Sequence, residues 1–204
     1  VASLGMAFGA ATPEIAPADR KMYALRDVTG TVECIPLIAG SIMSKKLASG
    51  IDALVLDVKF GRGAFMHAET QARRLAETLV HIGKDFGKPT VGLLTEMDHP
   101  LGSAVGNWPE TAEAIKALHG EIKNDLAEVT LSLAAEMIFL GGKATSVEEG
   151  REMAHRVVRD GSALAVLRTV VAEQEGDTSV VDQPESSPHN TSAFEIVAGA
   201  ENHG

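Results

Sequence analysis

The stretch Asp52-Ala53-Leu54-Val55-Leu56-Asp57-Val58-Lys59 decides the fold class of this chain. Its nearly continuous apolar run is typical of a central parallel strand that is covered on both faces. The segment from Glu69 to Phe86 places its apolar residues three or four positions apart, which predicts a helix. A second buried strand is predicted over Thr90–Thr95, so that strand, helix and strand form a βαβ unit with a parallel sheet and a right-handed crossover. The sequence therefore predicts an α/β protein.

Two helices are predicted before this unit. The first begins at Pro17 and carries Asp19 in its first turn. The second runs from Pro36 to Ala48, with a proline in its first turn and Gly50 just past its end, where a left-handed residue is often needed. The apolar stretch Ser3–Ala11 predicts a further buried strand at the start of the chain.

The second half of the chain is predicted to be helical. Asn107, Ser146 and Ser162 are expected to cap three helices, because their side chains accept hydrogen bonds from free amides of a first turn. Glu149 follows Ser146 by three positions and completes the pattern of a capping box. The apolar run Leu126–Leu140 predicts a core helix.

These elements predict a parallel-sheet domain with flanking helices plus a helical segment of a second, mostly absent α domain. The expected parts are residues 1–16 as the end of an α/β strand region and a hinge, 17–48 as the helical-domain segment, 49–175 as the α/β domain, 176–192 as a linker, and 193–204 as the start of a β-rich part with a strand over Ala193–Ala198. Because the chain begins at Val1 rather than at a methionine, it is expected to be a piece of a longer protein.

The composition excludes several classes of function. With 28 acidic and 18 basic residues the net charge is -10, which argues against a nucleic acid or an anionic membrane surface as the main partner. The single cysteine, Cys34, permits no internal disulfide and favours a reducing, cytoplasmic location. No apolar run is long enough for a transmembrane helix. The seven histidines form no pair at zinc-binding spacing, and neither a G-x-S-x-G elbow nor a P-loop occurs.

Three hydrogen-bonding residues are associated with the two N-terminal helices: Arg26, Ser41 and Lys45. Because Ser41 and Lys45 are four positions apart, a hydroxyl and an ammonium project together from one helix face. Beside an apolar wall, such groups suit a flat ligand with acceptor oxygens and a ring N–H. Taken singly, a surface arginine and a lysine in a last helical turn are more often solvated. The glycine loop Gly61-Arg62-Gly63 follows a strand, but it lacks the third glycine of a dinucleotide site.

The motifs Y-A-L-R-D-V-T (residues 23–29), S-I-M-S-K-K (41–46) and D-A-L-V-L-D-V-K-x-G-x-G-A-F-M (52–66) resemble those of the thymidine and pyrimidine-nucleoside phosphorylases. The resemblance extends from about residue 5 to residue 184 and is specific across residues 17–66. It implies a pentosyltransferase that splits either thymidine alone or a broader set that includes uridine and deoxyuridine, with phosphate as the co-substrate. The products are the free base and (deoxy)ribose 1-phosphate. The resemblance further implies that no cofactor is required and that the full-length protein is a homodimer.

The resemblance also implies roles for individual residues. Arg26 and Lys45 would be catalytic, because cationic donors stabilise the negative charge that builds up on the carbonyl oxygens of the leaving base. Ser41 would meet the ring edge that carries N3–H. The residues that would wall the base are Tyr23, Val32, Ile38, Ile42 and Phe65. Ordinary core packing is the alternative interpretation of these wall residues.

Two further implications concern ions. In some bacterial members of the family a monovalent or calcium-like cation is held nearby, and the matching positions here are Leu101, Ala104 and Glu113. Oxygen ligands of that kind suit a hard cation. The phosphate-binding motifs of the family, of the K-H-S-T-G-G and S-G-R-G-L-G-H-T-G-G-T types, occur nowhere in the sequence. The chain is therefore expected to carry the base-binding half of the site and to be inactive alone.

Two other interpretations stay open. The chain would be a non-catalytic piece that serves only in binding or assembly, or it would belong to a transferase like the anthranilate phosphoribosyltransferases. These share a related architecture, but they use a diphosphate ribose donor and a metal, and no carboxylate pair suited to that metal occurs in the sequence. The motifs fit thymidine-only and broader pyrimidine specificity equally.

Overall fold

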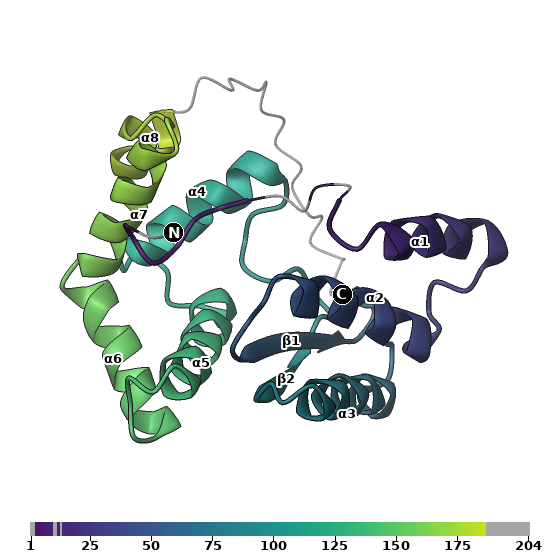
Figure 1. Ribbon diagram of the computed structural model, residues 1–204. Coiled ribbons are helices and arrows are strands. Elements are labelled where there is room, and N and C mark those ends of the chain that lie inside the picture. The colour runs from purple at the N-terminus through teal and green to yellow at the C-terminus, as the bar shows by residue number, and fades with distance from the viewer. Residues whose placement is uncertain (1–2, 10–11, 13, 187–204) are drawn as a thin grey trace, which may run out of the picture.

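The computed structural model describes residues 3–9, 12 and 14–186 and has the predicted α/β architecture (Figure 1). Its elements in chain order are α1 (Pro17–Thr29), α2 (Ile35–Ala48), β1 (Leu54–Phe60), α3 (Glu69–Asp85), β2 (Thr90–Glu96), α4 (Asn107–Leu118), α5 (Asp125–Leu140), α6 (Val147–Arg159), α7 (Ser162–Glu173), α8 (Ser179–Asp182) and the 3₁₀ turn η1 (Pro184–Ser186). The predicted strand Ala193–Ala198 lies outside the described residues. Across the described ranges, no helix is both long and apolar enough to cross a membrane.

The βαβ unit is confirmed. Strands β1 and β2 pair in parallel, with a register that runs from Leu54 opposite Thr90 to Phe60 opposite Glu96. Helix α3 connects them and packs on both strands. The core between these elements contains Val58, Leu75 and Leu79, because the apolar positions of β1 and α3 fall on facing sides.

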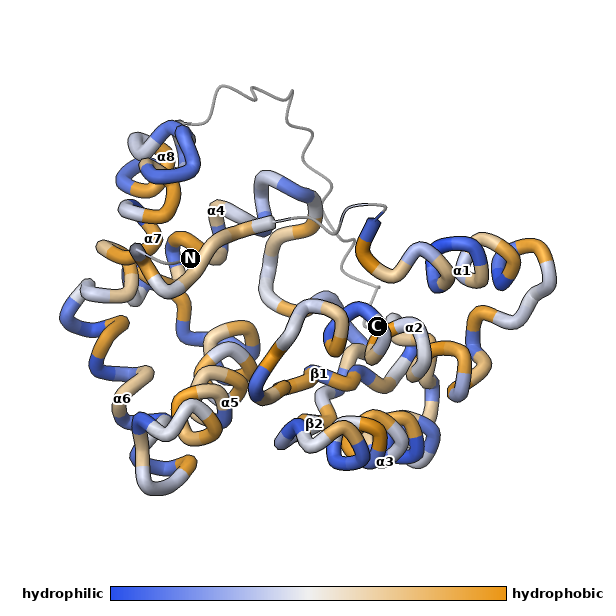
Figure 2. Tube along the Cα trace, viewed as in Figure 1, coloured by the Kyte–Doolittle hydropathy of each residue, from blue (hydrophilic) through white to orange (hydrophobic). Residues whose placement is uncertain are grey.

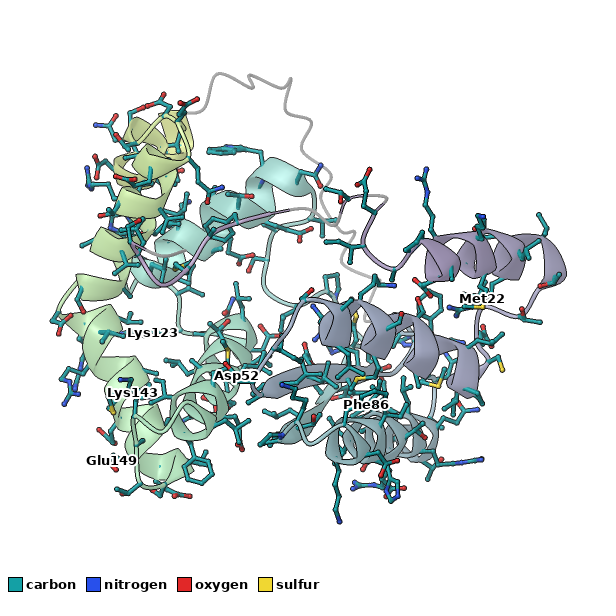
Figure 3. All side chains as sticks on the ribbon, in the orientation of Figure 1. Met22, Asp52, Phe86, Lys123, Lys143 and Glu149 are labelled. Atoms are coloured by element: carbon teal, nitrogen blue, oxygen red, sulfur yellow. The ribbon has the colours of Figure 1, made fainter. Side chains whose placement is uncertain are left out.

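The two N-terminal helices are confirmed as well. Helix α2 packs against α3 and buries Ala39 and Met43 in the same core. Past its end, Gly50 has a φ of 70°, the left-handed conformation that the sequence predicts there. Helix α1 lies alongside α2 and contacts few other elements (Figure 1). Consequently Met22 on α1 stays exposed. Phe86, which follows α3, is also exposed (Figure 3).

The second half of the chain forms a helical layer beside the strands. Helix α5, which is largely hydrophobic (Figure 2), contacts β1 and β2, and α6 packs along it. A Cβ atom at Gly150 of α6 would lie 2.6 Å from the main-chain oxygen of Ala135 in α5, so glycine permits this close approach. Arg151 of α6 adds an ion pair of 2.6 Å to Glu128 of α5.

The predicted strand Ser3–Ala11 is wrong over its described part, because residues 3–9 form no strand. The main chain of Phe8 instead pairs with the side chain of Gln174. Its N–H donates to Oε1 and its carbonyl accepts from Nε2, both at 2.8 Å. A side-chain amide thus takes up the backbone groups that a neighbouring strand would have used.

The predicted cap at Asn107 is wrong by one position. Asn107 is the first residue of α4, and Gly106 occupies the cap position with a φ of 122°. The amide of Gly106 donates to Oε1 of Glu110 at 2.8 Å. The carboxylate in the first turn therefore ties down the helix start, where the sequence suggested the Asn107 side chain.

The predicted cap at Ser162 is also wrong by one position. Gly161 caps α7, and the amide of Ser162 donates to Oδ1 of Asp160 at 2.9 Å. At α6 the cap Ser146 is confirmed, since its hydroxyl accepts from the amide of Glu149. The predicted return bond from the Ser146 amide to the Glu149 side chain is replaced. The Glu149 carboxylate accepts instead from the amide and the hydroxyl of Thr145.

Within the range predicted as a linker, residues 179–182 form α8 and residues 184–186 form η1. Val181 of α8 is fully buried, and its carbonyl lies 2.9 Å from Nε2 of His119, which follows α4. Lys116 of α4 forms an ion pair of 2.9 Å with Glu185. These contacts fasten the segment onto α4.

Candidate base-binding site

Helix α1 carries three of the relevant side chains on one face. Pro17 begins the helix, and Asp19 lies in its first turn, where the helix dipole favours a negative charge. Tyr23 follows Asp19 by four residues and Arg26 follows it by seven, so all three lie on the same side of the helix. Asp19 and Arg26 are the two buried residues of α1.

Helix α2 brings Ser41 and Lys45 to the same place. The hydroxyl of Ser41 donates to Oδ2 of Asp19 at 3.1 Å, and Nζ of Lys45 donates to that oxygen at 2.6 Å. Nζ of Lys45 also donates to Oγ of Ser41 at 2.8 Å. The predicted pairing of Ser41 with Lys45 is thus present, closed into a triangle by a carboxylate.

The electrostatics of the triangle favour an ionised Asp19. Burial opposes its ionisation and is the largest single influence, but hydrogen bonds from Lys45 and Ser41, together with the charges of Lys45 and Arg26, act in the opposite direction. Their sum lowers the pKa of the Asp19 carboxyl below its ordinary value. At neutral pH Asp19 is therefore a carboxylate that only accepts hydrogen bonds.

Arg26 is buried but incompletely paired. Its Nη2 donates to the main-chain oxygen of Val32, and its guanidinium lies 5.0 Å from the centre of the Tyr23 ring. Its Nε is buried and has no hydrogen-bond partner among the described residues. A buried donor without a partner costs free energy, so a ligand oxygen at this atom would be stabilising.

An apolar cavity of about 500 Å³ lies next to β1 and the loop that follows it, and Arg26, Ser41 and Lys45 are not among the residues that line it. It is lined by Ile38 and Ile42 of α2, by Phe65 and Met97, and by the charged side chains of Lys59 and Arg62. Ile38 and Ile42 are each three positions from Ser41 or Lys45, so the polar triangle and the cavity are neighbours on α2. The size is ordinary for a small-molecule site.

Close packing explains why glycines occupy positions 61 and 63 of the loop after β1. A Cβ atom at Gly61 would lie 2.6 Å from Oδ1 of Asp98, and one at Gly63 would lie 2.8 Å from the main-chain oxygen of Met97. The loop after β1 must therefore press against the loop after β2. This approach fixes the start of the segment that carries Phe65 into the cavity wall.

The predicted residues are thus distributed over neighbouring groups. Ser41 and Lys45 are in direct contact, Arg26 contacts Tyr23 and Val32, and Ile38, Ile42 and Phe65 line the cavity. Sequence reasoning noted Asp19 only as a residue of the first helical turn. Its spacing of seven residues from Arg26 was the available signal, because that spacing places the two residues on one helix face.

The predicted cation positions lie in another loop. Glu113 of α4 is buried, and its two carboxylate oxygens accept the amides of Ser103 and Ala104 at 2.8 and 3.1 Å. Leu101 begins the same turn, next to Gly102. The recorded partners of the Glu113 carboxylate are therefore main-chain N–H donors, whereas a hard cation would need oxygen ligands around it. Across the described ranges, His, Cys, Asp and Glu side chains form no metal-binding group of three or more.

Comparisons with known proteins agree with this architecture. Residues 1–164 match the glycosyl transferase family, a/b domain. The chain is 50% identical over 184 residues to a pyrimidine-nucleoside phosphorylase of Geobacillus stearothermophilus, which covers 90% of this chain and 42% of that protein. It is 47% identical to the protein of the same name from Bacillus subtilis (strain 168), over 90% of this chain and 42% of that protein. It is also 47% identical to the one from Staphylococcus haemolyticus (strain JCSC1435), over 93% of this chain and 43% of that protein.

The chain spans about two fifths of the length of these curated relatives. The family match nevertheless covers the N-terminal helices, the βαβ unit and helices α4 to α6. The protein is therefore a member of the glycosyl transferase family, and most of the chain corresponds to the a/b domain of that family.

Proposed function

We propose that this chain is the base-binding part of a pyrimidine-nucleoside phosphorylase. The enzyme would transfer the pentose of thymidine, uridine or deoxyuridine to phosphate and release the free base. The names of relatives at 47–50% identity support this reaction over that of an anthranilate phosphoribosyltransferase. The proposal includes phosphate as the co-substrate, a homodimeric full-length protein, and a cytoplasmic location that the single cysteine favours.

The chemistry needs donors at the base. When the bond between sugar and base breaks, negative charge spreads over the two carbonyl oxygens of the leaving pyrimidine. Cationic donors that are held in place before the reaction stabilise this charge more than they stabilise the neutral substrate, and this difference lowers the barrier. Arg26 and Lys45 are assigned this role, Ser41 is assigned to the ring N–H, and the apolar cavity is assigned to the ring faces.

The observation that carries the proposal is the unpaired Nε of Arg26. This buried cation has an unused donor, and Lys45 lies within electrostatic reach because both residues influence the same carboxylate, Asp19. Two cations and a hydroxyl beside an apolar cavity form a site for a flat, anionic leaving group.

The proposal also includes a monovalent or calcium-like cation at the Glu113 loop. The Glu113 carboxylate would hold it together with main-chain oxygens of Leu101 and Ala104. Such an ion would neutralise the buried carboxylate and stiffen the turn before α4. It is assigned no step in the reaction.

The test compares this 204-residue chain with a version that is extended to the length of the relatives. Phosphate-dependent release of thymine from thymidine is expected for the extended protein only, because the K-H-S-T-G-G type of phosphate loop is absent from this sequence. Turnover by the 204-residue chain would contradict the assignment of phosphate binding to other parts. A lack of turnover by the extended protein would overturn the proposed function.

A further inference from the structure

The hydrogen atoms in the Asp19 triangle can be assigned without ambiguity. An ionised carboxylate only accepts hydrogen bonds and a lysine ammonium only donates them. Ser41 lies 3.1 Å from Oδ2 of Asp19 and 2.8 Å from Nζ of Lys45. Its hydroxyl must therefore donate to Asp19 and accept from Lys45.

This assignment fixes what the three residues can offer to a ligand. Ser41 has used its one hydrogen and retains one lone pair, so it can only accept. Lys45 has used two of its three N–H groups on Asp19 and Ser41, and the third has no partner in the described part of the chain. Arg26 retains its Nε–H. The site thus presents donors at Arg26 and Lys45 and an acceptor at Ser41.

The pattern complements one kind of pyrimidine. The edge of uracil and thymine presents an oxygen acceptor, the N3–H donor and a second oxygen acceptor. The edge of cytosine presents an oxygen acceptor, an unprotonated N3 acceptor and an amino donor. Against cytosine, Ser41 would set an acceptor against an acceptor, and a cation would meet the amino group.

We propose that Asp19 is a positioning residue that determines base specificity by holding the Ser41 hydroxyl hydrogen, so that the site accepts 2,4-dioxopyrimidines and rejects 4-aminopyrimidines. The inference rests on the proposed function, since it assumes that a pyrimidine binds at Ser41. Without Asp19 the hydroxyl is free to rotate. Ser41 would then donate to N3 of cytosine as readily as it accepts N3–H of uracil.

The experiment measures the affinities of uracil and cytosine by calorimetry, and kcat/KM for uridine and cytidine, in the protein extended to the length of its relatives. Asp19→Ala is expected to reduce the preference for uracil over cytosine by about tenfold or more, the usual effect of one mismatched buried hydrogen bond. Asp19→Leu has a similar size and offers no acceptor to the Ser41 hydroxyl, so it should reduce the preference even if Asp19→Ala does not fold.

Two further variants separate specificity from structure. Ser41→Ala should reduce the preference as much as Asp19→Ala does, and adding Asp19→Ala to Ser41→Ala should change it no further, because Asp19 acts through that hydroxyl. Asp85→Ala removes an exposed carboxylate from the end of α3 and should leave the preference unchanged. An equal loss of uracil and cytosine affinity in the Asp19 variants, with the ratio unchanged, would overturn the inference while leaving the proposed function in place. Wild-type protein that binds no uracil would overturn both.

Discussion

Nζ of Lys45 donates to Oδ2 of Asp19 across 2.6 Å, although the two residues are 26 positions apart and lie on different helices. The side chain of Asp19 is 9% exposed and that of Lys45 is 37% exposed, so the pair is only partly shielded from water. The same carboxylate oxygen also accepts the Ser41 hydroxyl. One atom of α1 therefore fixes two donors of α2.

The first prediction concerns stability and pH. Because the folded-state pKa of Asp19 is lowered, its contribution to the free energy of unfolding is fully present above the unfolded-state value of about 4 and is lost as pH falls through the folded-state value. Asp19→Asn should therefore destabilise the chain at pH 7 by about 1–2 kcal/mol, between the values for exposed and buried pairs. Urea unfolding of both proteins from pH 7 to pH 2 measures this difference.

The difference between the two proteins should shrink below pH 4 and approach zero at the acid end. A constant difference across that range would show that the charge of Asp19 contributes no stability.

The second prediction concerns activity. In the extended protein, Arg26→Ala and Lys45→Ala should each lower kcat/KM by about 100-fold or more, as the removal of one donor to a developing negative charge does in other enzymes. Lys46→Ala is the matched control, because Lys46 is exposed and lies about 100° around α2 from Lys45. Steady-state kinetics with thymidine at saturating phosphate decide the comparison. Equal losses for the two lysines would refute the assigned helix face.

The third prediction concerns closure of the site. Gly50 separates the N-terminal helices from β1, and closing the site around the base would exclude water and strengthen the contacts of Arg26 and Lys45. Gly50 and Gly142 have φ values of 70° and 66°, both follow a helix, and a Cβ atom at either would meet nothing within 4 Å. Alanine at each should cost about 1 kcal/mol of stability through backbone strain alone.

Only Gly50→Ala should also lower kcat in the extended protein. Thermal melting and kcat of the two variants, compared side by side, test this hinge. If both variants retain wild-type kcat, closure does not turn at Gly50. Gly50→Pro is unsuitable for this test, since proline cannot adopt a positive φ and would remove the Gly50 amide that donates to Leu47 at 3.1 Å.

The fourth prediction concerns the cation at Glu113. Potassium or calcium ions should raise the melting temperature relative to a bulky organic cation at equal ionic strength, because a ligand that binds only the folded state stabilises it. Glu113→Gln should abolish the rise, whereas Glu121→Gln, which alters an exposed residue, should preserve it. Identical melting temperatures in all three salts would argue against the cation site.

The sequence by itself determined the elements whose signal is local. These signals are the apolar run of β1, the helical spacing of apolar residues in α3, and the prolines and glycines at the ends of α1 and α2. Each depends only on residues that are close in the sequence, so periodicity and local sterics are enough to predict the element. The face shared by Ser41 and Lys45 follows for the same reason. Caps were misplaced by one residue where a glycine took the cap position and a carboxylate of Glu110 or Asp160 bonded the helix start.

Only the tertiary structure decided what these residues face. The triangle of Asp19, Ser41 and Lys45 exists because α1 packs on α2, and no local pattern specifies which side chains meet across two helices. The same holds for residues 3–9, where an apolar run predicted a strand and the Gln174 side chain took the main-chain partners of Phe8. The hydrogen bond that orients Ser41 joins residues 22 positions apart. Its donor direction follows from the negative charge of Asp19, which hydrogen bonds and neighbouring cations maintain against the opposing effect of burial. Long-range packing decides such contacts, because their energy depends on which groups desolvate one another in the folded chain.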